Sequence, residues 1–221
     1  MQLDIVSDTI CPWCLIGKRR FEKALRQRPD LDLTITWHPF QLNPEMPAGG
    51  MDRREYLDRK FGGPEGAERI YEAVRAAGEA EGISFAFEEI ERVPNTVDSH
   101  RLIHWANREG HQDAVVEDLF RRYFIDGEDI GDHAVLVGAA AEAGMDGEAI
   151  AARLSTDEDV ERVRGAANEA SRMGVSGVPC FIFEGRDAVS GAQDPAVFLQ
   201  AFDSLGTVGV GAEAMAPAAT P

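Results

Sequence analysis

Two cysteines near the start of the chain, Cys11 and Cys14, are separated by Pro12 and Trp13 in the segment SDTICPWCLIG. This spacing can provide two ligands of a zinc site, form a redox-active disulfide, or place two inert thiols in a core. A closed zinc site needs four ligands, and the chain has five histidines and one further cysteine, Cys180, but no second paired motif. The residues therefore favour redox chemistry, and we predict no metal.

The segments on either side of the motif predict a β-α-β unit. Residues 2–7 alternate apolar and polar side chains, as a strand does, and residues 31–40 repeat the pattern. Residues 12–27 carry an apolar stripe, and Pro12 suits the first position of a helix. The cysteine motif therefore lies where a strand passes into a helix, with Cys11 at the helix N-cap.

This placement predicts a reactive thiol. The unpaired N–H groups and the positive dipole end of a helix N-terminus stabilise a thiolate, although Asp8 would oppose it if close. Cys14 lies one turn later, within reach of a disulfide with Cys11. We therefore expect an exposed, acidic Cys11 beside Cys14. A structural disulfide, inert core cysteines, and a non-redox use of Cys11 to bind or activate glutathione remain alternatives.

A second signal is the segment SGVPCFIF, in which Val178 and Pro179 come just before an apolar strand. The Val-Pro bond is expected to be cis in a functional turn, or an ordinary trans bond that opens a strand. Because Pro179 has no N–H group, the backbone of Val178 is free to pair with an extended ligand. Strands at 178–185 and 188–192 then form a hairpin, followed by a helix at 194–205.

The middle of the chain, from about residue 53 to 173, consists of amphipathic segments separated by capping residues and glycines, which predicts helices. A helical insertion at 46–154 thus divides a small α/β domain formed by 1–45 and 155–205. The tail at 206–221 is rich in Gly, Ala and Pro, and we expect it to be flexible.

Composition excludes several classes of partner. The net charge of −17 disfavours binding to nucleic acid or to anionic membranes, both of which select lysine and arginine. No apolar run approaches the roughly 18 residues of a membrane-spanning helix, and the start of the chain does not resemble a signal peptide. We therefore predict a cytoplasmic protein, in which a Cys-x-x-Cys motif is more often catalytic than structural.

Several blocks of the sequence together resemble a known family. They are CPWCLIG, HPFQLNP, VPNTVDSHRLIHWA, YFIDGEDIGD and SRMGVSGVPCFIF, within about residues 3–203. They are similar to DsbA-like proteins of the thioredoxin fold, in the cytoplasmic FrnE-like branch. That branch is related to 2-hydroxychromene-2-carboxylate isomerases and kappa-class glutathione transferases. The resemblance implies an α/β thioredoxin fold with a large, all-helical insertion.

The resemblance further implies a thiol–disulfide oxidoreductase. Cys11 would attack, Cys14 would resolve the mixed disulfide, and Pro179 would be a cis-proline facing both. Val178 would offer backbone hydrogen bonds to the substrate. The isomerase branch typically has a single serine or cysteine at the position of Cys11, so the presence of both cysteines favours redox chemistry.

The expected partners are thiol or disulfide substrates, either proteins or small molecules. No bound cofactor is predicted, glutathione is the candidate co-substrate, and a homodimer is left open. Two other functions remain: a glutathione-dependent isomerase or transferase, and a non-enzymatic, thiol-dependent chaperone or binding module.

Other residues are assigned to the surroundings of the site. Trp13 is predicted to be an exposed platform for substrate. Cys180 follows the proline where relatives usually have another residue, so it is either a third thiol coupled to the pair or a small buried strand residue. His100 and His104 are interpreted as a helix face packed against the site. Secondary candidates for substrate binding are Phe40, Leu42, Asn43 and Asn95.

Overall fold

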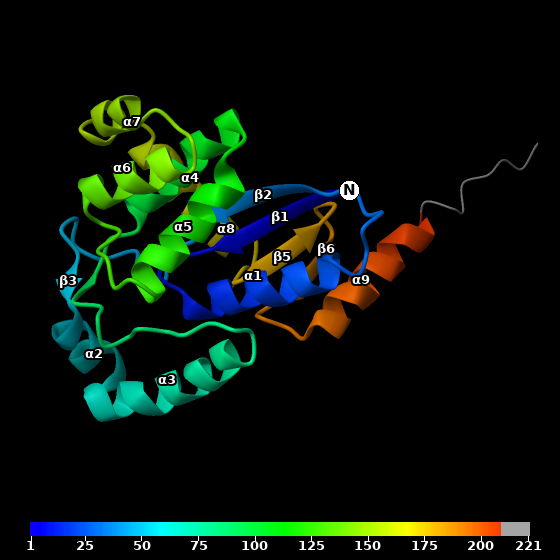
Figure 1. Ribbon diagram of the computed structural model, residues 1–221, viewed down its shortest axis with the longest axis horizontal. Helices are drawn as coiled ribbons and strands as arrows, with labels where there is room; N and C mark the ends of the chain where they lie inside the picture. The colour runs from blue at the N-terminus through cyan, green and yellow to red at the C-terminus, as the bar shows by residue number, and fades with distance from the viewer. Residues whose placement is uncertain (209–221) are drawn as a thin grey trace, which may run out of the picture.

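The computed structural model describes residues 1–208. These residues include a sheet of four strands, β1 (Gln2–Ser7), β2 (Thr34–Pro39), β5 (Cys180–Phe183) and β6 (Asp187–Ser190). The strand order is β2-β1-β5-β6, with β1 parallel to β2 and antiparallel to β5, and β5 antiparallel to β6 (Figure 1). The predicted β-α-β start and the predicted C-terminal hairpin are both present.

Two helices, α1 (Pro12–Leu25) and α9 (Pro195–Val208), pack on one face of this sheet (Figure 1). The rings of Phe21 in α1 and Phe198 in α9 lie 5.5 Å and 4.8 Å from that of Phe181 in β5, measured between centroids. Burial of such side chains, each worth about 1.5–3 kcal/mol, fixes α1 against the sheet. The final helix runs past its predicted end, and the rest of the predicted tail, 209–221, lies outside the described residues.

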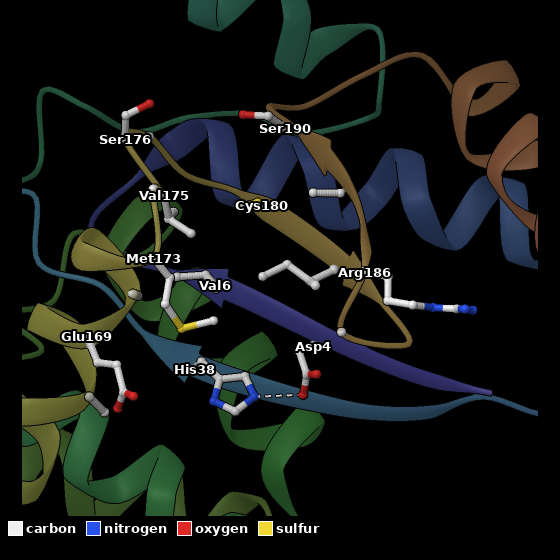
Figure 2. A pocket seen from close by; sticks show the side chains of 17 residues that line it. Asp4, Val6, His38, Glu169, Met173, Val175, Ser176, Cys180, Arg186 and Ser190 are labelled. Atoms are coloured by element: carbon white, nitrogen blue, oxygen red, sulfur yellow. Dashed lines mark hydrogen bonds and ion pairs between the residues drawn. The ribbon is translucent and has the colours of Figure 1, made fainter.

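The opposite face of the sheet borders α8 (Val160–Arg172) and a cavity of about 570 Å³ that reaches β1, β5 and β6 (Figure 2). We call this space the back cavity; Asp4, Val6 and His38 line it. The Nε2 atom of His38 lies 2.8 Å from Oδ1 of Asp4. Because side chains alternate along a strand, these residues point away from the core that Ile5 forms with α1.

The middle of the chain is helical, as predicted. It contains α2 (Arg53–Phe61), α3 (Pro64–Glu79), α4 (Val97–Glu109), α5 (Gln112–Phe124), α6 (His133–Glu142) and α7 (Gly147–Leu154). It also contains two short antiparallel strands that were not predicted, β3 (Met51–Asp52) and β4 (Arg92–Val93). Strands of two residues are too short to show the alternation by which a strand is recognised in sequence.

Helix α5 attaches this helical region to the sheet. Gln112 is buried at the start of α5, where its side-chain amide accepts from the N–H of Trp37 at 2.9 Å and donates to its carbonyl at 3.0 Å. Trp37 lies in β2 at the edge of the sheet, where backbone groups lack a neighbouring strand. The side chain of Gln112 therefore satisfies these edge groups and orients α5.

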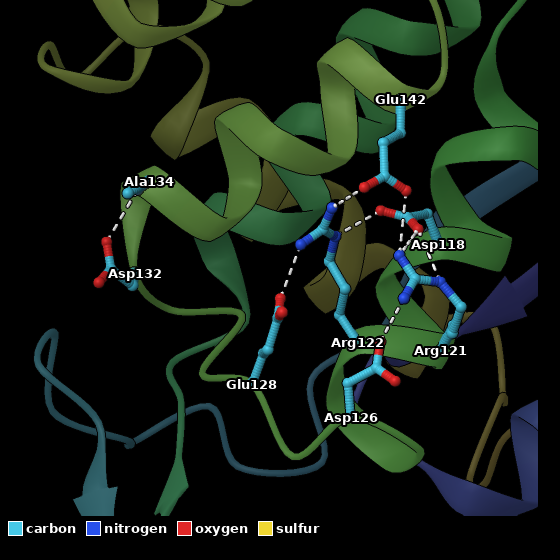
Figure 3. A network of polar contacts seen from close by, with 8 residues as sticks. All are labelled: Asp118, Arg121, Arg122, Asp126, Glu128, Asp132, Ala134 and Glu142. Carbon is cyan, nitrogen blue, oxygen red and sulfur yellow. Dashed lines mark hydrogen bonds and ion pairs between the residues drawn. The ribbon is translucent and has the colours of Figure 1, made fainter.

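A charged network holds α5 against α6 (Figure 3). Arg122 is almost buried, and its guanidinium donates to Asp118 in the same helix, to Glu128 at 2.7 Å and to Glu142 in α6 at 2.6 Å. A buried guanidinium costs little only when its donors are satisfied, as they are here by three carboxylates. The network therefore fixes the connection between the two helices.

A second network joins α1 to α5. Lys18 is 3% exposed and forms ion pairs with Glu22 in its own helix, with Asp113 at 3.3 Å and with Glu117 at 3.0 Å. Arg19 is also paired with Glu117. These contacts link the helix that carries the two cysteines to the helical region.

The second network predicts a pH dependence of stability. Burial opposes ionisation of Glu117, but hydrogen bonds and charges from Arg19 and Lys18 hold its pKa at about 2, below the ordinary 4.5. Its stabilising contribution is therefore present above about pH 4.5 and is lost as the pH falls toward 2. We expect Glu117→Gln to lower the free energy of unfolding at neutral pH. The difference from wild type should shrink between about pH 5 and about pH 3 in urea titrations.

The matched control is Glu161→Gln. The side chain of Glu161 is 86% exposed and pairs with Arg164 on the surface of α8, so its removal should change stability little at either pH. A difference between Glu117→Gln and wild type that stays constant with pH would contradict the assigned role of Glu117.

Candidate active site

The two cysteines lie at the start of α1, as predicted. Cys11 is the N-cap residue, in an extended conformation with φ −93° and ψ 110°, and Pro12 is the first helical residue. The N–H of Cys11 donates to the carbonyl of Asp8 at 3.0 Å, and the N–H of Cys14 donates to the carbonyl of Cys11 at 2.9 Å. Both side chains are free thiols. The turn therefore places two thiols one helical turn apart at a helix N-terminus.

The expected exposure of Cys11 is wrong. Cys11 is 4% exposed and Cys14 is fully buried. Cys11 instead lines a cavity of about 290 Å³ that is closed on its other sides by residues of α2, α3 and α5. Its Sγ atom lies 3.7 Å from the carbonyl oxygen of Val178, which also lines the cavity. A reactant therefore reaches Cys11 by entering this space, which we call the aromatic cavity.

The surroundings of Cys14 make it a poor acid. Burial raises the pKa of its thiol well above the ordinary value, and the hydrogen bond and charge of Cys11 raise it further. Hydrogen bonds from the Ser7 hydroxyl and the Asp8 backbone act in the opposite direction. Cys14 is therefore held as a thiol, with Ser7 and Asp8 placed to stabilise the thiolate when it forms.

The segment before β5 packs directly on α1. The Val178–Pro179 peptide bond is cis, and Pro179 is buried. Gly17 in α1 faces this proline so closely that a Cβ atom at Gly17 would lie 2.7 Å from Cγ of Pro179. Gly17 therefore allows the loop that carries Val178 to approach the helix that carries the cysteines.

A buried carboxylate lies behind the cysteines. Asp8 is fully buried; its Oδ2 accepts from the N–H of Leu42 at 2.7 Å, and its Oδ1 lies 3.5 Å from Nε2 of His100. His100, also buried, forms a hydrogen bond with the carbonyl of Phe40 at 2.9 Å. Within residues 1–208, Oδ1 of Asp8 has no hydrogen-bond partner. The sequence identified Asp8 only as a nearby charge, and His100 lies on the helix face packed against the site, as interpreted.

Several predicted residues meet at the aromatic cavity. Cys11, Pro12, Trp13, Leu42 and Val178 all line it, and Trp13 and Leu42 are each 36% exposed at its rim. The expected exposure of Trp13 is therefore confirmed, and its position allows contact with a ligand.

Three of the four residues predicted to bind substrate lie elsewhere. Asn43 does not line the cavity but accepts from Nζ of Lys60, which does, at 2.8 Å. Phe40 packs with Val6 on the other side of the sheet. Asn95 precedes the N-cap residue of α4, Thr96. It accepts from the N–H of Val97 and donates to the carbonyl of Met46, so it ties the start of α4 to the loop after β2.

Cys180 does not face Cys11 and Cys14. It is paired with Val6 in the sheet and lines the back cavity, on the face opposite to α1 (Figure 2). Burial raises the pKa of its thiol. The geometry therefore favours a small buried strand residue and does not support a thiol coupled to Cys11 and Cys14.

Apart from Ile10 and Gly177, the cavity-lining residues that the sequence did not assign to the site come from the insertion. The walls of the aromatic cavity include Arg53, Tyr56, Lys60, Phe61, Ile70, Tyr71, Phe87, Tyr123 and Phe124. Their signal in the sequence is a set of aromatic residues in amphipathic helices, which is equally typical of a core. Only the tertiary arrangement shows whether such residues line a cavity or form a core.

Two further properties bear on function. In the part of the chain that the structure describes, no three or more His, Cys, Asp or Glu side chains form a group that could hold a metal ion. No helix among residues 1–208 has the length and apolar character needed to span a bilayer.

Comparisons with known proteins agree with this geometry. Residues 2–203 match the family model of the DSBA-like thioredoxin domain. The crystal structure of a probable DsbA oxidoreductase from Streptomyces coelicolor is 31% identical and superposes with a TM-score of 0.84, over 100% of this chain and 94% of that one. The predicted thioredoxin fold is therefore confirmed.

Two more distant structures share the fold. The cytosolic disulfide reductase DsbM from Pseudomonas aeruginosa, solved with GSH, is 18% identical with a TM-score of 0.65, over 94% of this chain and 100% of that one. A 2-hydroxychromene-2-carboxylate isomerase is 16% identical with a TM-score of 0.68, over 94% of this chain and 96% of that one.

The environment of Cys14 predicts the effect of Ser7→Ala. Loss of the hydroxyl removes a hydrogen bond that lowers the pKa of Cys14, so that pKa rises further. Because the thiolate is the nucleophile, attack by Cys14 on a mixed disulfide at Cys11 should become slower, and its pH–rate curve should move to higher pH. Release of 2-nitro-5-thiobenzoate from a preformed mixed disulfide at Cys11 measures this step. Ser99→Ala, which removes a buried hydroxyl bonded to Thr9, is the control; an unshifted curve for Ser7→Ala would refute the role of Ser7.

The contact between Gly17 and Pro179 predicts that Gly17→Ala is destabilising. The new methyl group forces α1 or the loop to move, at a typical overpacking cost of about 1–3 kcal/mol. Gly165→Ala in α8 is the matched control, because a Cβ there meets no heavy atom of residues 1–208 within 4 Å. It should raise stability by about 0.5–1 kcal/mol. Thermal unfolding compares the two, and equal effects would show that the contact is not tight.

Proposed function

Because the chain belongs to the DSBA-like thioredoxin domain family, we propose that it is a thiol–disulfide oxidoreductase that works through Cys11 and Cys14. The observation that carries the proposal is the arrangement of the two thiols. Cys11 lines a cavity at a helix N-terminus, and Cys14 is a free thiol buried one turn behind it. Such a pair can exchange two electrons with a disulfide without any further cofactor.

The first step uses Cys11. Its thiolate attacks one sulfur of a substrate disulfide, the S–S bond breaks, and the other substrate sulfur leaves with the electron pair as a thiolate. The carbonyl of Val178, 3.7 Å from Sγ of Cys11, lies beside the reacting atoms, where an extended substrate can pair with this backbone.

The second step uses Cys14. It loses its proton and attacks Sγ of Cys11, which breaks the mixed disulfide and releases the second substrate thiolate. The protein then holds a Cys11–Cys14 disulfide, and the substrate has gained the two electrons that the protein lost. The reverse sequence oxidises a substrate dithiol. Ser7 and the backbone of Asp8 stabilise the Cys14 thiolate during this step.

The proposed substrates are thiols or disulfides, with glutathione as the co-substrate that returns the pair to its dithiol form. A reducing, cytoplasmic setting fits this cycle. The fold shared with a cytosolic disulfide reductase solved with GSH supports both assignments.

The fold shared with an isomerase favours a second candidate, a glutathione-dependent isomerase or transferase. Such an enzyme would need Cys11 to bind or activate glutathione but would not need Cys14. The two candidates therefore differ in their dependence on Cys14.

The test is disulfide formation in the protein. Titration against mixtures of reduced and oxidised glutathione, read by mass spectrometry, should give an intramolecular Cys11–Cys14 disulfide. Reduction of hydroxyethyl disulfide by the reduced protein should fall to background in both Cys11→Ser and Cys14→Ser. Cys180→Ala, which alters the buried thiol on the opposite face of the sheet, is the control and should retain activity.

Two results would contradict the proposal. If no disulfide forms at any glutathione ratio, the pair is not redox-active. If a glutathione-dependent reaction survives Cys14→Ser unchanged, the isomerase or transferase is favoured. Protection of an unfolding client that survives loss of both cysteines would instead indicate a chaperone or binding module.

A further inference from the structure

The aromatic cavity has walls that suit a flat, apolar ligand. The rings of Tyr71 and Phe87 stack with centroids 4.4 Å apart, and the ring of Phe61 meets Tyr71 edge-on at 6.3 Å. Tyr56 meets Phe61 edge-on at 6.2 Å. These rings line the space that Cys11 also lines. A planar aromatic group gains both burial and ring–ring contacts in such a site.

The same wall carries two cations. The guanidinium of Arg53 lies 5.3 Å from the centroid of Tyr71, and Nζ of Lys60 lies 5.1 Å from that of Tyr56. Within residues 1–208, neither cation forms an ion pair with a carboxylate, although the chain has a net charge of −17. Lys60 gives one of its three donors to Oδ1 of Asn43 at 2.8 Å. Both cations therefore keep donors for an anion, and a guanidinium binds a carboxylate with two parallel hydrogen bonds.

The size of the cavity restricts what can reach the thiol. Its volume of about 290 Å³ is at the lower end of the range of about 300–1,000 Å³ found for small-molecule sites. Cys11 is 4% exposed, so the reacting disulfide must lie inside. The rim is apolar, because Trp13, Leu42 and Ile70 are large exposed side chains that line it. These dimensions fit one aromatic ring with its disulfide, rather than a folded protein surface.

We infer that the disulfide reduced at Cys11 belongs to a small molecule in which an aromatic ring carries a carboxylate. The inference rests on the proposed function and names its substrate class. The ring lies among Tyr56, Phe61 and Tyr71, and the carboxylate binds Arg53 and Lys60. The Cys11 thiolate breaks the S–S bond and an aryl thiolate leaves. Cys14 then gives up its proton to solvent and releases the second aryl thiolate, so one disulfide is reduced as the protein pair is oxidised.

The experiment compares three disulfides in single-turnover reactions with the reduced protein. They are 5,5′-dithiobis(2-nitrobenzoate), which is aromatic and anionic, 4,4′-dithiodipyridine, which is aromatic and neutral, and hydroxyethyl disulfide, which is neither. Each rate is divided by the rate of the same disulfide with 2-mercaptoethanol, an uncharged thiol, which removes differences in intrinsic reactivity. We expect the normalised rate to be highest for the dinitrobenzoate and lowest for hydroxyethyl disulfide.

Matched variants locate the cause. Arg53→Gln with Lys60→Gln should lower the ratio of the dinitrobenzoate rate to the hydroxyethyl disulfide rate by about tenfold, the effect of about 1.4 kcal/mol of lost interaction. Tyr71→Leu should lower the ratio for both aromatic disulfides. The control, Arg54→Gln with Arg59→Gln, removes the same charge from the same helix at residues that do not line the aromatic cavity. It should leave all ratios unchanged.

The failures are distinguishable. If none of the three disulfides and no ratio of oxidised glutathione produces a Cys11–Cys14 disulfide, the proposed function is wrong, and the inference falls with it. If they do produce it, but the normalised rates are equal and the two double variants behave alike, only the substrate class is wrong. A higher normalised rate with a cysteine-containing peptide disulfide than with the dinitrobenzoate would likewise overturn the substrate class and favour peptides.

Discussion

The turn between β1 and α1 depends on one fully buried carboxylate, that of Asp8. The backbone carbonyl of Asp8 accepts from the N–H of Cys11, and its side chain accepts from the N–H of Leu42. The carboxylate also lies against His100 of α4. A buried carboxylate is costly unless it has partners. Leu42 supplies a hydrogen bond to Oδ2, whereas Oδ1 has only His100 nearby, at 3.5 Å. Asp8 thus links three segments: the turn that carries Cys11, the loop after β2 and helix α4 of the insertion.

The insertion converts a common α/β scaffold into an enclosed site. Aromatic side chains of α2, α3 and α5 line the cavity that Cys11 also lines, and Cys11 is 4% exposed. The ion pairs of Lys18 and Glu117 hold α1 to α5, and Gln112 holds α5 to the edge of β2. Scaffold and insertion are therefore tied at the helix that carries the thiols.

The parts of the molecule that sequence could predict are those decided locally. A strand, a cysteine at the N-cap and a proline at the first helical position depend on neighbours along the chain, and so CPWC could be placed at the strand-to-helix junction. The orientation of Cys180 depends on its register opposite Val6, which is a long-range pairing. The burial of Cys11 and the position of Tyr71 in a cavity wall likewise depend on how the helices pack against each other. An amphipathic pattern in the sequence is the same whether the apolar face forms a core or lines a cavity.

The complete burial of Cys14 has a consequence for the timing of events at Cys11. In the proposed cycle, a substrate joined to Cys11 in a mixed disulfide would occupy the cavity through which other thiols must enter, and the nearest nucleophile would be Cys14, which attacks once it has lost its proton. The lifetime of the mixed disulfide would then depend on the pKa of Cys14 rather than on the concentration of thiols in solution. The burial of Cys14 and the hydrogen bonds around its sulfur would then set how long the mixed disulfide at Cys11 persists.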